Sequence, residues 1–115
     1  MLTDEYRYKI LKIIEAKPDI SQRNLALKLG ISLGKVNFCL KALIDVGLLK
    51  VVNFKNNKNK LSYMYLITPT AVEQKTAITM RFLKHKIHEY ETLKAEIAEL
   101  RLENIYETNV EKAYD

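Results

Sequence analysis

The sequence is poor in the residues that form cross-links and in long apolar runs. It contains a single cysteine, Cys39, so the chain cannot form an internal disulfide, which fits a reducing compartment. No apolar run approaches the roughly 18 residues that a membrane-spanning helix needs. The start of the chain, residues 1–5, does not resemble a signal peptide. We therefore expect a cytoplasmic protein with no membrane partner.

Motifs of catalysis and metal binding are also missing. The sequence has no glycine-rich phosphate loop and no set of nucleophile and base, so we predict no enzyme and no cofactor. Its two histidines, His85 and His88, lie three residues apart beside Glu89, and a solvated helix face explains them better than a metal site does. For Cys39, a small buried apolar side chain is favoured over a redox sensor.

The basic residues are concentrated in the middle of the chain. The net charge is +5, and residues 21–72 hold eight basic side chains against one acid, Asp45. Residues 73–115 hold nine acids and seven bases. This distribution points to a polyanionic partner for the middle segment, although a solvated basic surface is the alternative.

Helix-start signals recur along the first half of the chain. Thr3 can cap a helix that ends before Pro18, Ser21 one that runs to Leu29, and Ser32 one that runs to about residue 46. Glycines at positions 30 and 47 suit the ends of the last two helices. Because only two residues lie between the second helix and the cap of the third, the two should cross steeply, as in a helix-turn-helix.

The pattern then changes from helical to extended. Residues 48–54 and 61–67 are rich in Val, Tyr and Leu and flank a polar, basic run, which predicts a β-hairpin. Thr68 and Pro69 then open a helix that contains no glycine or proline and can continue to about Tyr106. We thus expect a mainly α fold: a winged helix-turn-helix over residues 1–68, a long dimerisation helix over 69–107 and a frayed tail over 108–115.

The third helix should place one face in the core and one against a partner. Val36, Leu40, Leu43 and Ile44 share the apolar face. The first turns of the second and third helices carry Arg23 and Lys35 and no acid, although helix N-termini favour acids by about 0.3–1 kcal/mol each. Both N-termini are therefore suited to bind phosphates of duplex DNA. The predicted DNA-binding residues are Ser21, Gln22, Arg23, Ser32, Gly34, Lys35, Asn37, Phe38, Lys41 and, on the hairpin tip, Lys55, Lys58 and Lys60.

Residues 2–68 resemble the MarR-type winged-helix regulators, and in particular the EPS-associated transcriptional regulators linked to exopolysaccharide gene clusters. The resemblance rests on the start from Thr3 to Tyr8, Ser21-Gln22-Arg23, the stretch from Gly30 to Asn37, Leu40 to Leu43, Gly47-Leu48, Asn53-Phe54, Lys60-Leu61, Tyr63 to Pro69, and, in the tail, Met80 to Lys84. It implies sequence-specific DNA binding as a dimer and control of polysaccharide genes. Typical MarR proteins have an additional N-terminal dimerisation helix, so whether this chain binds a small-molecule effector is left open.

The last predicted helix has one apolar stripe. A helix of this length with a single apolar face needs a partner, and a second copy is favoured over the chain's own head or another protein. The predicted dimerisation residues are Leu83, Ile87, Tyr90, Leu93, Ile97 and Leu100, in two short segments offset by a three-residue step. Such a dimer would read the two halves of an inverted repeat.

Two functions from different classes fit these features. The first is a DNA-binding transcriptional regulator, with a repressor preferred because nothing suggests a polymerase-contacting domain. The alternative is a winged-helix adaptor that binds protein or RNA. An adaptor would not need Lys35 and Lys41 beside a lysine-rich hairpin tip, so double-stranded DNA is the expected partner.

Overall fold

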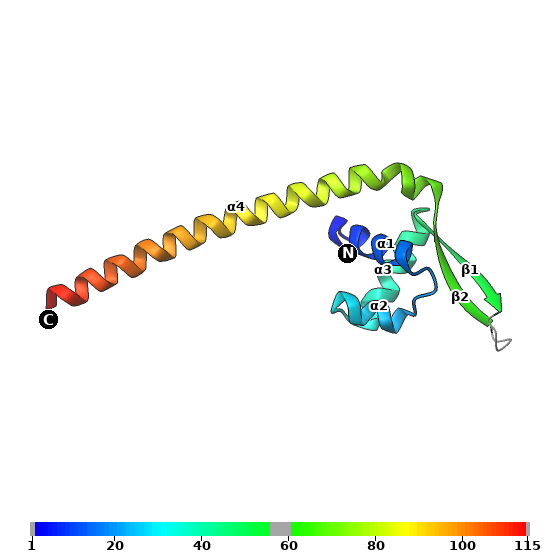
Figure 1. Ribbon diagram of the computed structural model, residues 1–115, viewed down its shortest axis with the longest axis horizontal. Helices are drawn as coiled ribbons and strands as arrows, with labels where there is room; N and C mark the ends of the chain where they lie inside the picture. Colours follow the sequence, from blue (N-terminus) through cyan, green and yellow to red (C-terminus); the bar gives the residue numbers. More distant parts are fainter. Residues whose placement is uncertain (1, 56–60, 115) are drawn as a thin grey trace. The chain divides into compact units, whose positions relative to one another are not determined.

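The computed structural model describes residues 2–55 and 61–114, with the backbone alone for residues 54, 55, 61, 62 and 110–114. The elements are α1 (Asp4–Ala16), α2 (Gln22–Leu29), α3 (Leu33–Asp45), β1 (Leu49–Lys55), β2 (Leu61–Ile67) and α4 (Pro69–Tyr114). This order confirms the predicted architecture of three helices, a hairpin and a long helix (Figure 1). The chain divides into two compact units, Met1–Phe82 and Leu83–Asp115.

Each of the first three helices begins behind a hydroxyl N-cap, as predicted. The side-chain oxygen of the cap accepts a hydrogen bond from the backbone N–H three residues later. These bonds, of 3.1–3.2 Å, join Thr3 to Tyr6, Ser21 to Asn24 and Ser32 to Lys35. Because such a cap is worth about 1 kcal/mol, the sequence sets the start of each helix locally.

The turn between α2 and α3 depends on a glycine. Gly30 adopts the left-handed conformation with φ 67° and ψ 34°, where a side chain would be strained. Its N–H donates to the Ala26 carbonyl, and the N–H of Ile31 donates to the same oxygen at 3.2 Å. The chain can therefore leave α2 and enter α3 within a few residues, which gives the helix-turn-helix.

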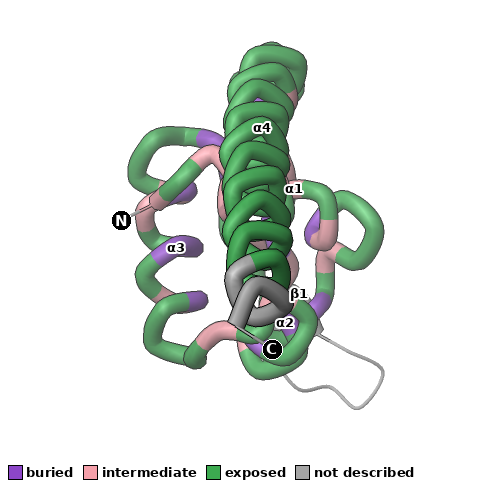
Figure 2. The backbone as a smooth tube through the Cα atoms, turned by 90° about the vertical axis from the view of Figure 1, so that its left-hand side faces the viewer, coloured by how far each residue is buried: buried purple, intermediate pink, exposed green. Residues whose placement is uncertain are grey.

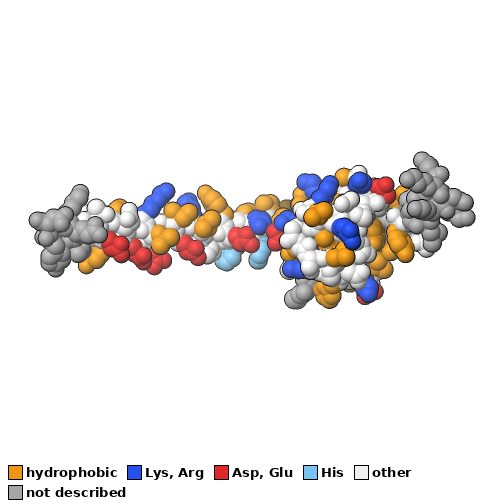
Figure 3. Space-filling model, turned by 90° about the horizontal axis from the view of Figure 1, so that it is seen from below, with side chains coloured by type: hydrophobic (Ala, Val, Ile, Leu, Met, Phe, Trp, Pro, Cys, Tyr) orange, Lys and Arg blue, Asp and Glu red, His pale blue; other side chains and the backbone are white. Residues whose placement is uncertain are grey.

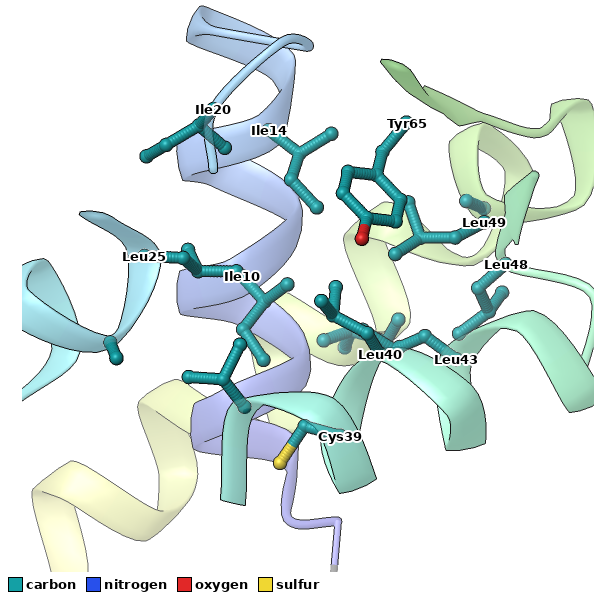
Figure 4. Packing of buried hydrophobic residues seen from close by; sticks show 14 residues of the cluster. Ile10, Ile14, Ile20, Leu25, Cys39, Leu40, Leu43, Leu48, Leu49 and Tyr65 are labelled. Carbon is teal, nitrogen blue, oxygen red and sulfur yellow. The ribbon is translucent and has the colours of Figure 1, made fainter. Parts of the chain in front are cut away.

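The core of the first unit joins all three short helices to the hairpin and to the start of α4. The close-up shows side chains from α1, α3 and β2 pointing toward one another (Figure 4). The apolar face predicted for α3 is buried at Val36, Leu40 and Leu43, and Ile44 is half-buried. The remaining buried side chains are Ile10, Ile14, Ile20, Leu25, Ala26, Cys39, Leu48, Leu49, Tyr65, Ala71 and Ile78.

The hairpin is antiparallel and is tied to the helices at its base. Leu49 pairs with Ile67 and Lys55 with Leu61. The N–H of Tyr65 donates to the carbonyl of Pro18 at 2.9 Å, and the N–H of Thr68 donates to that of Leu48 at 3.2 Å. Strand β2 is thereby held between β1 and the loop that links α1 to α2.

Helix α4 begins at Pro69 as expected, but the end of the first compact unit and the end of the helix differ from the expectation. The first compact unit extends through Phe82, beyond the expected boundary at residue 68, because Ala71 and Ile78 lie in the core and the rings of Tyr8 and Phe82 stack with centroids 5.1 Å apart. The helix also continues to Tyr114, through residues that were expected to fray. Neither glycine nor proline follows Pro69, so no residue interrupts the helix.

Candidate nucleic-acid interface

The outward face of α3 carries half of the residues predicted to bind DNA. Val36, Leu40 and Leu43 turn inward, which leaves the opposite side of the helix to solvent. Asn37 is half-buried. The exposed residues of this face are Ser32, Leu33, Gly34, Lys35, Phe38 and Lys41. We call these six together with Asn37 the α3 face.

Lys35 has a partner within the compact unit. Its Nζ lies 4.6 Å from the centroid of the Tyr6 ring, at the distance of a cation–π interaction. Such a contact is worth about 0.5–1 kcal/mol at an exposed site. The side chain of Lys35 remains exposed, so its ammonium group stays accessible to an anion from outside.

The start of α2, the first helix of the helix-turn-helix, carries three further residues that were predicted to bind DNA. Ser21 and Arg23 are exposed, and the Ser21 hydroxyl already serves as the N-cap. Gln22 is half-buried and turns toward the protein. Of the three DNA-binding residues predicted here, Ser21 and Arg23 therefore lie at the surface and Gln22 lies partly inside.

Gln22 lies at the centre of a chain of side-chain hydrogen bonds. Its Nε2 donates to the hydroxyl of Tyr65 at 3.2 Å, and its Oε1 accepts from Nδ2 of Asn37 at 3.3 Å. This chain joins β2, α2 and α3. Tyr65 is not among the residues predicted from the sequence, although its alternation with Tyr63 along the strand places the two side chains on one face.

The electrostatics of the two helix starts favour anions. Neither α2 nor α3 has an acidic residue in its first turn, so no carboxylate offsets the positive end of either helix dipole. Arg23, Lys35 and Lys41 add exposed cations nearby. On the face drawn in Figure 3, Lys and Arg side chains are spread over the first unit, whereas Asp and Glu side chains are frequent along the second.

Residues 3–50 match the family of winged helix-turn-helix DNA-binding domains. The match covers α1, α2, α3 and the start of β1, and the hairpin and helix that follow complete the same plan. The first unit has a winged-helix fold. The match supports a DNA-binding transcriptional regulator, and winged helix-turn-helix DNA-binding families are typically non-enzymatic. No curated protein matches the chain significantly.

The β1–β2 hairpin is the wing of the fold, and its basic tip lies mainly outside the described residues. Lys58 and Lys60 fall in the gap, and Lys55 ends β1 with only its backbone described. The role expected for these three lysines stays a prediction.

Cys39 on α3 of the winged helix is fully buried, as expected, and burial raises the pKa of its thiol. Among the described residues, no three or more His, Cys, Asp or Glu side chains are grouped so that they could bind a metal ion. Within the same part of the chain, no helix combines the length and the apolar character of a membrane span.

The winged helix also has an apolar groove, away from the α3 face. It has a volume of about 380 Å³ and lies between α1 and the start of α4. Tyr8, Leu11, Val72 and Ile78 contribute to its walls, whereas no residue of α2 or α3 lines it. The groove is thus separate from the candidate DNA-binding surface.

The second unit carries the predicted pairing stripe. All six predicted dimerisation residues are exposed, with fractions from 40% at Ile97 to 62% at Tyr90. In Figure 2 the helix is exposed along this part of its length. Large apolar side chains that are spaced along one face of a helix and exposed to water form a surface without a partner.

Proposed function

We propose that the chain is a sequence-specific regulator of transcription, a repressor, that binds an inverted repeat in double-stranded DNA as a homodimer. In this arrangement α3 enters the major groove, while the start of α2 and the wing contact the flanking backbone. The observation that carries the proposal is the pair of helix starts without acids, beside exposed Arg23, Lys35 and Lys41.

The residues of the interface have different roles. Lys35 and Lys41 donate to phosphates or to guanine, Asn37 pairs with adenine, and Phe38 contacts a thymine methyl group. Ser32 and Gly34 allow the start of α3 to approach a phosphate closely. Ser21, Gln22 and Arg23 anchor α2, and Lys55, Lys58 and Lys60 contact the backbone from the wing.

Pairing through α4 provides the two-fold symmetry that an inverted repeat requires. Leu83, Ile87 and Tyr90 form one part of the stripe, and Leu93, Ile97 and Leu100 form the other. Burying these side chains against a second copy stabilises the dimer by about 25 cal/mol for each Å² of apolar surface removed from water. The unpaired helix would leave that area exposed.

The likeness to the EPS-associated MarR-type regulators supports exopolysaccharide genes as the targets, with the protein acting in the cytoplasm. To test this, purified protein is mixed with sheared genomic DNA and the bound fragments are sequenced. We expect enrichment of a few fragments that share an inverted repeat near polysaccharide genes. Enrichment of no fragment would overturn sequence-specific binding.

A salt titration tests the electrostatic part of the proposal. Each phosphate contact should contribute about −0.9 to the slope of log K against log salt, so Lys41→Ala should make the slope less steep by about that amount. Lys75→Ala is the matched control, since Lys75 pairs with Glu15 on α1 at 3.4 Å and lies away from the α3 face. A slope near zero for the unaltered protein would contradict the assignment.

The second candidate function is an adaptor that binds RNA or protein through the same scaffold. The acid-free helix starts fit phosphates and so favour a nucleic acid over a protein. Competition between duplex DNA and duplex RNA of the same sequence then distinguishes a DNA-binding regulator from an RNA-binding adaptor. We expect DNA to displace labelled DNA at a much lower concentration than RNA does, because the major groove of RNA is too narrow for α3.

A further inference from the structure

The hydrogen-bonded side chains of Tyr65, Gln22 and Asn37 connect the core of the winged helix to its α3 face. Tyr65 is only 6% exposed, and its backbone N–H is bonded to the Pro18 carbonyl. Its hydroxyl is therefore fixed by β2 and the core. Gln22 and Asn37 are both half-buried, and Asn37 belongs to the α3 face.

The donor and acceptor in each of these hydrogen bonds determine which groups of the Asn37 amide remain available to a ligand. Nε2 of Gln22 donates to Tyr65, so its Oε1 is turned toward Asn37 and accepts an N–H from it. One N–H of the Asn37 amide is thereby used. Its carbonyl oxygen and its second N–H remain for a ligand.

That remaining pair of groups matches one base. In the major groove, adenine presents an acceptor at N7 and a donor at N6, whereas guanine presents two acceptors. We propose that Tyr65 is a positioning residue which, through Gln22, orients the Asn37 amide so that α3 recognises adenine. This proposal rests on the proposed function, because it names how the same surface selects a base.

The test must separate positioning from a purely structural role. Loss of packing would lower stability or overall affinity, but it would not change which base is preferred at one position. The readout is therefore base preference, measured by selecting duplexes from a random pool with the full chain and sequencing them. The position read by Asn37 is the one whose preference disappears in Asn37→Ala.

Tyr65→Phe removes the hydroxyl and keeps the ring. Gln22 then loses its fixed acceptor, and the Asn37 amide is free to turn. We expect the preference for adenine at the Asn37 position to fall about tenfold, while the salt slope and the preferences at other positions are kept. Tyr63→Phe makes the same chemical change on the same strand at a residue that is 63% exposed, and it should match the unaltered protein.

A rescue variant sharpens the test. Gln22→Glu has no N–H to donate, so it can only accept, and the Asn37 amide must keep its N–H directed toward residue 22. In the Tyr65→Phe background, Gln22→Glu should restore adenine preference even though its negative charge lowers overall affinity for DNA. Failure to restore it would overturn the proposed direction of the bonds.

The remaining outcomes are distinct. An unchanged preference in Tyr65→Phe overturns the role of Tyr65 and leaves DNA binding intact. If the unaltered protein enriches no sequence, the proposed function fails, and this inference fails with it. Should Tyr65→Phe not fold, Gln22→Leu severs both bonds at a half-buried position and must show the same loss at the same base.

Discussion

Gly34 is a residue of the α3 face that the fold itself does not require. It occupies the second position of α3, and a Cβ built on it would meet no atom within 4 Å. Alanine there would favour the helix by up to about 1 kcal/mol. The space next to Gly34 is therefore open at the surface. In the proposed complex, the wall of the DNA major groove would approach α3 there.

Gly34→Ala should change stability and DNA binding in opposite directions. We expect the free energy of unfolding to rise by about 0.5–1 kcal/mol, since the helix gains and nothing within the protein is displaced. Affinity for the selected operator should fall, because the new methyl group holds α3 away from the duplex. Urea unfolding and a binding titration measure the two effects, and unchanged affinity would show that Gly34 is not at the interface.

At the scale of elements, the sequence predicts best what is encoded locally. The N-caps Thr3, Ser21 and Ser32 each act on a donor three residues away, so the helix starts could be read from the chain. The bond between Gln22 and Tyr65 joins residues 43 apart and depends on how β2 packs on the helices. No local pattern predicts it.

The boundary at the start of α4 could not be predicted for the same reason. Thr68 and Pro69 correctly mark where the helix begins, and the sequence alone predicts that the first unit ends there. The helix returns to the core at Ile78 and contacts α1 at Phe82, which only the three-dimensional packing determines.

Ser32 caps α3 and, in the proposed complex, also lies against a DNA phosphate, and two substitutions separate these roles. Ser32→Ala loses the acceptor for the N–H of Lys35, so the free energy of unfolding should fall by about 1 kcal/mol. Ser32→Asp keeps a cap and suits the helix dipole, so stability should be retained. The added carboxylate should nevertheless weaken DNA binding strongly by repelling a phosphate.

Thermal unfolding and a binding titration on both variants check this expectation. Ser21→Asp is the matched change at the start of α2, where we expect a similar pattern. Full DNA affinity in Ser32→Asp would exclude a phosphate at the N-terminus of α3.

Helices α1 and α4 are joined by an ion pair whose strength depends on pH. Arg81 donates from Nε and Nη2 to the carboxylate of Asp4, at 3.0 and 3.2 Å, and Arg7 donates to it at 3.1 Å. The hydrogen bonds from Arg81, and then those from Arg7, hold the pKa of Asp4 below its ordinary value. The pairing therefore favours the folded state while Asp4 is ionised.

Asp4→Asn should destabilise the protein at neutral pH and not in strong acid. Because the folded-state pKa is lowered, the contribution is full above the unfolded-state pKa of about 3.9 and is lost as pH falls through the folded-state pKa. We expect a difference of about 1 kcal/mol at pH 7 that shrinks as pH falls and is lost once Asp4 is protonated in the folded state. Urea unfolding across this range measures it, with Asp19→Asn as control, and a constant difference would contradict the mechanism.

Across the whole molecule, charge separates the two surfaces that the proposed function uses. The basic excess lies in residues 21–72, whereas residues 73–115 carry nine acids and seven bases. Phosphates do not attract a segment of this composition. The apolar stripe of α4 is therefore better suited to pair with protein than to follow the duplex.

The stripe can be tested with two leucines on opposite sides of one helix. Leu93 belongs to the stripe, and Leu102, nine residues on, lies half a turn away at 3.6 residues per turn. Both are exposed, at 55% and 69%. Leu93→Lys should convert the dimer to a monomer in sedimentation experiments, since a charge cannot be buried in the seam. Leu102→Lys should sediment as a dimer, like the unaltered protein.

DNA binding should follow the state of assembly. A monomer engages one half-site at a time, so Leu93→Lys should lose on the order of 10²-fold or more in affinity for the full inverted repeat. Its affinity for a single half-site should equal that of the unaltered protein, because the α3 face is intact. A Leu93→Lys protein that remains dimeric would exclude the stripe as the pairing surface, and a monomer that binds the full repeat normally would show that recognition needs only one copy.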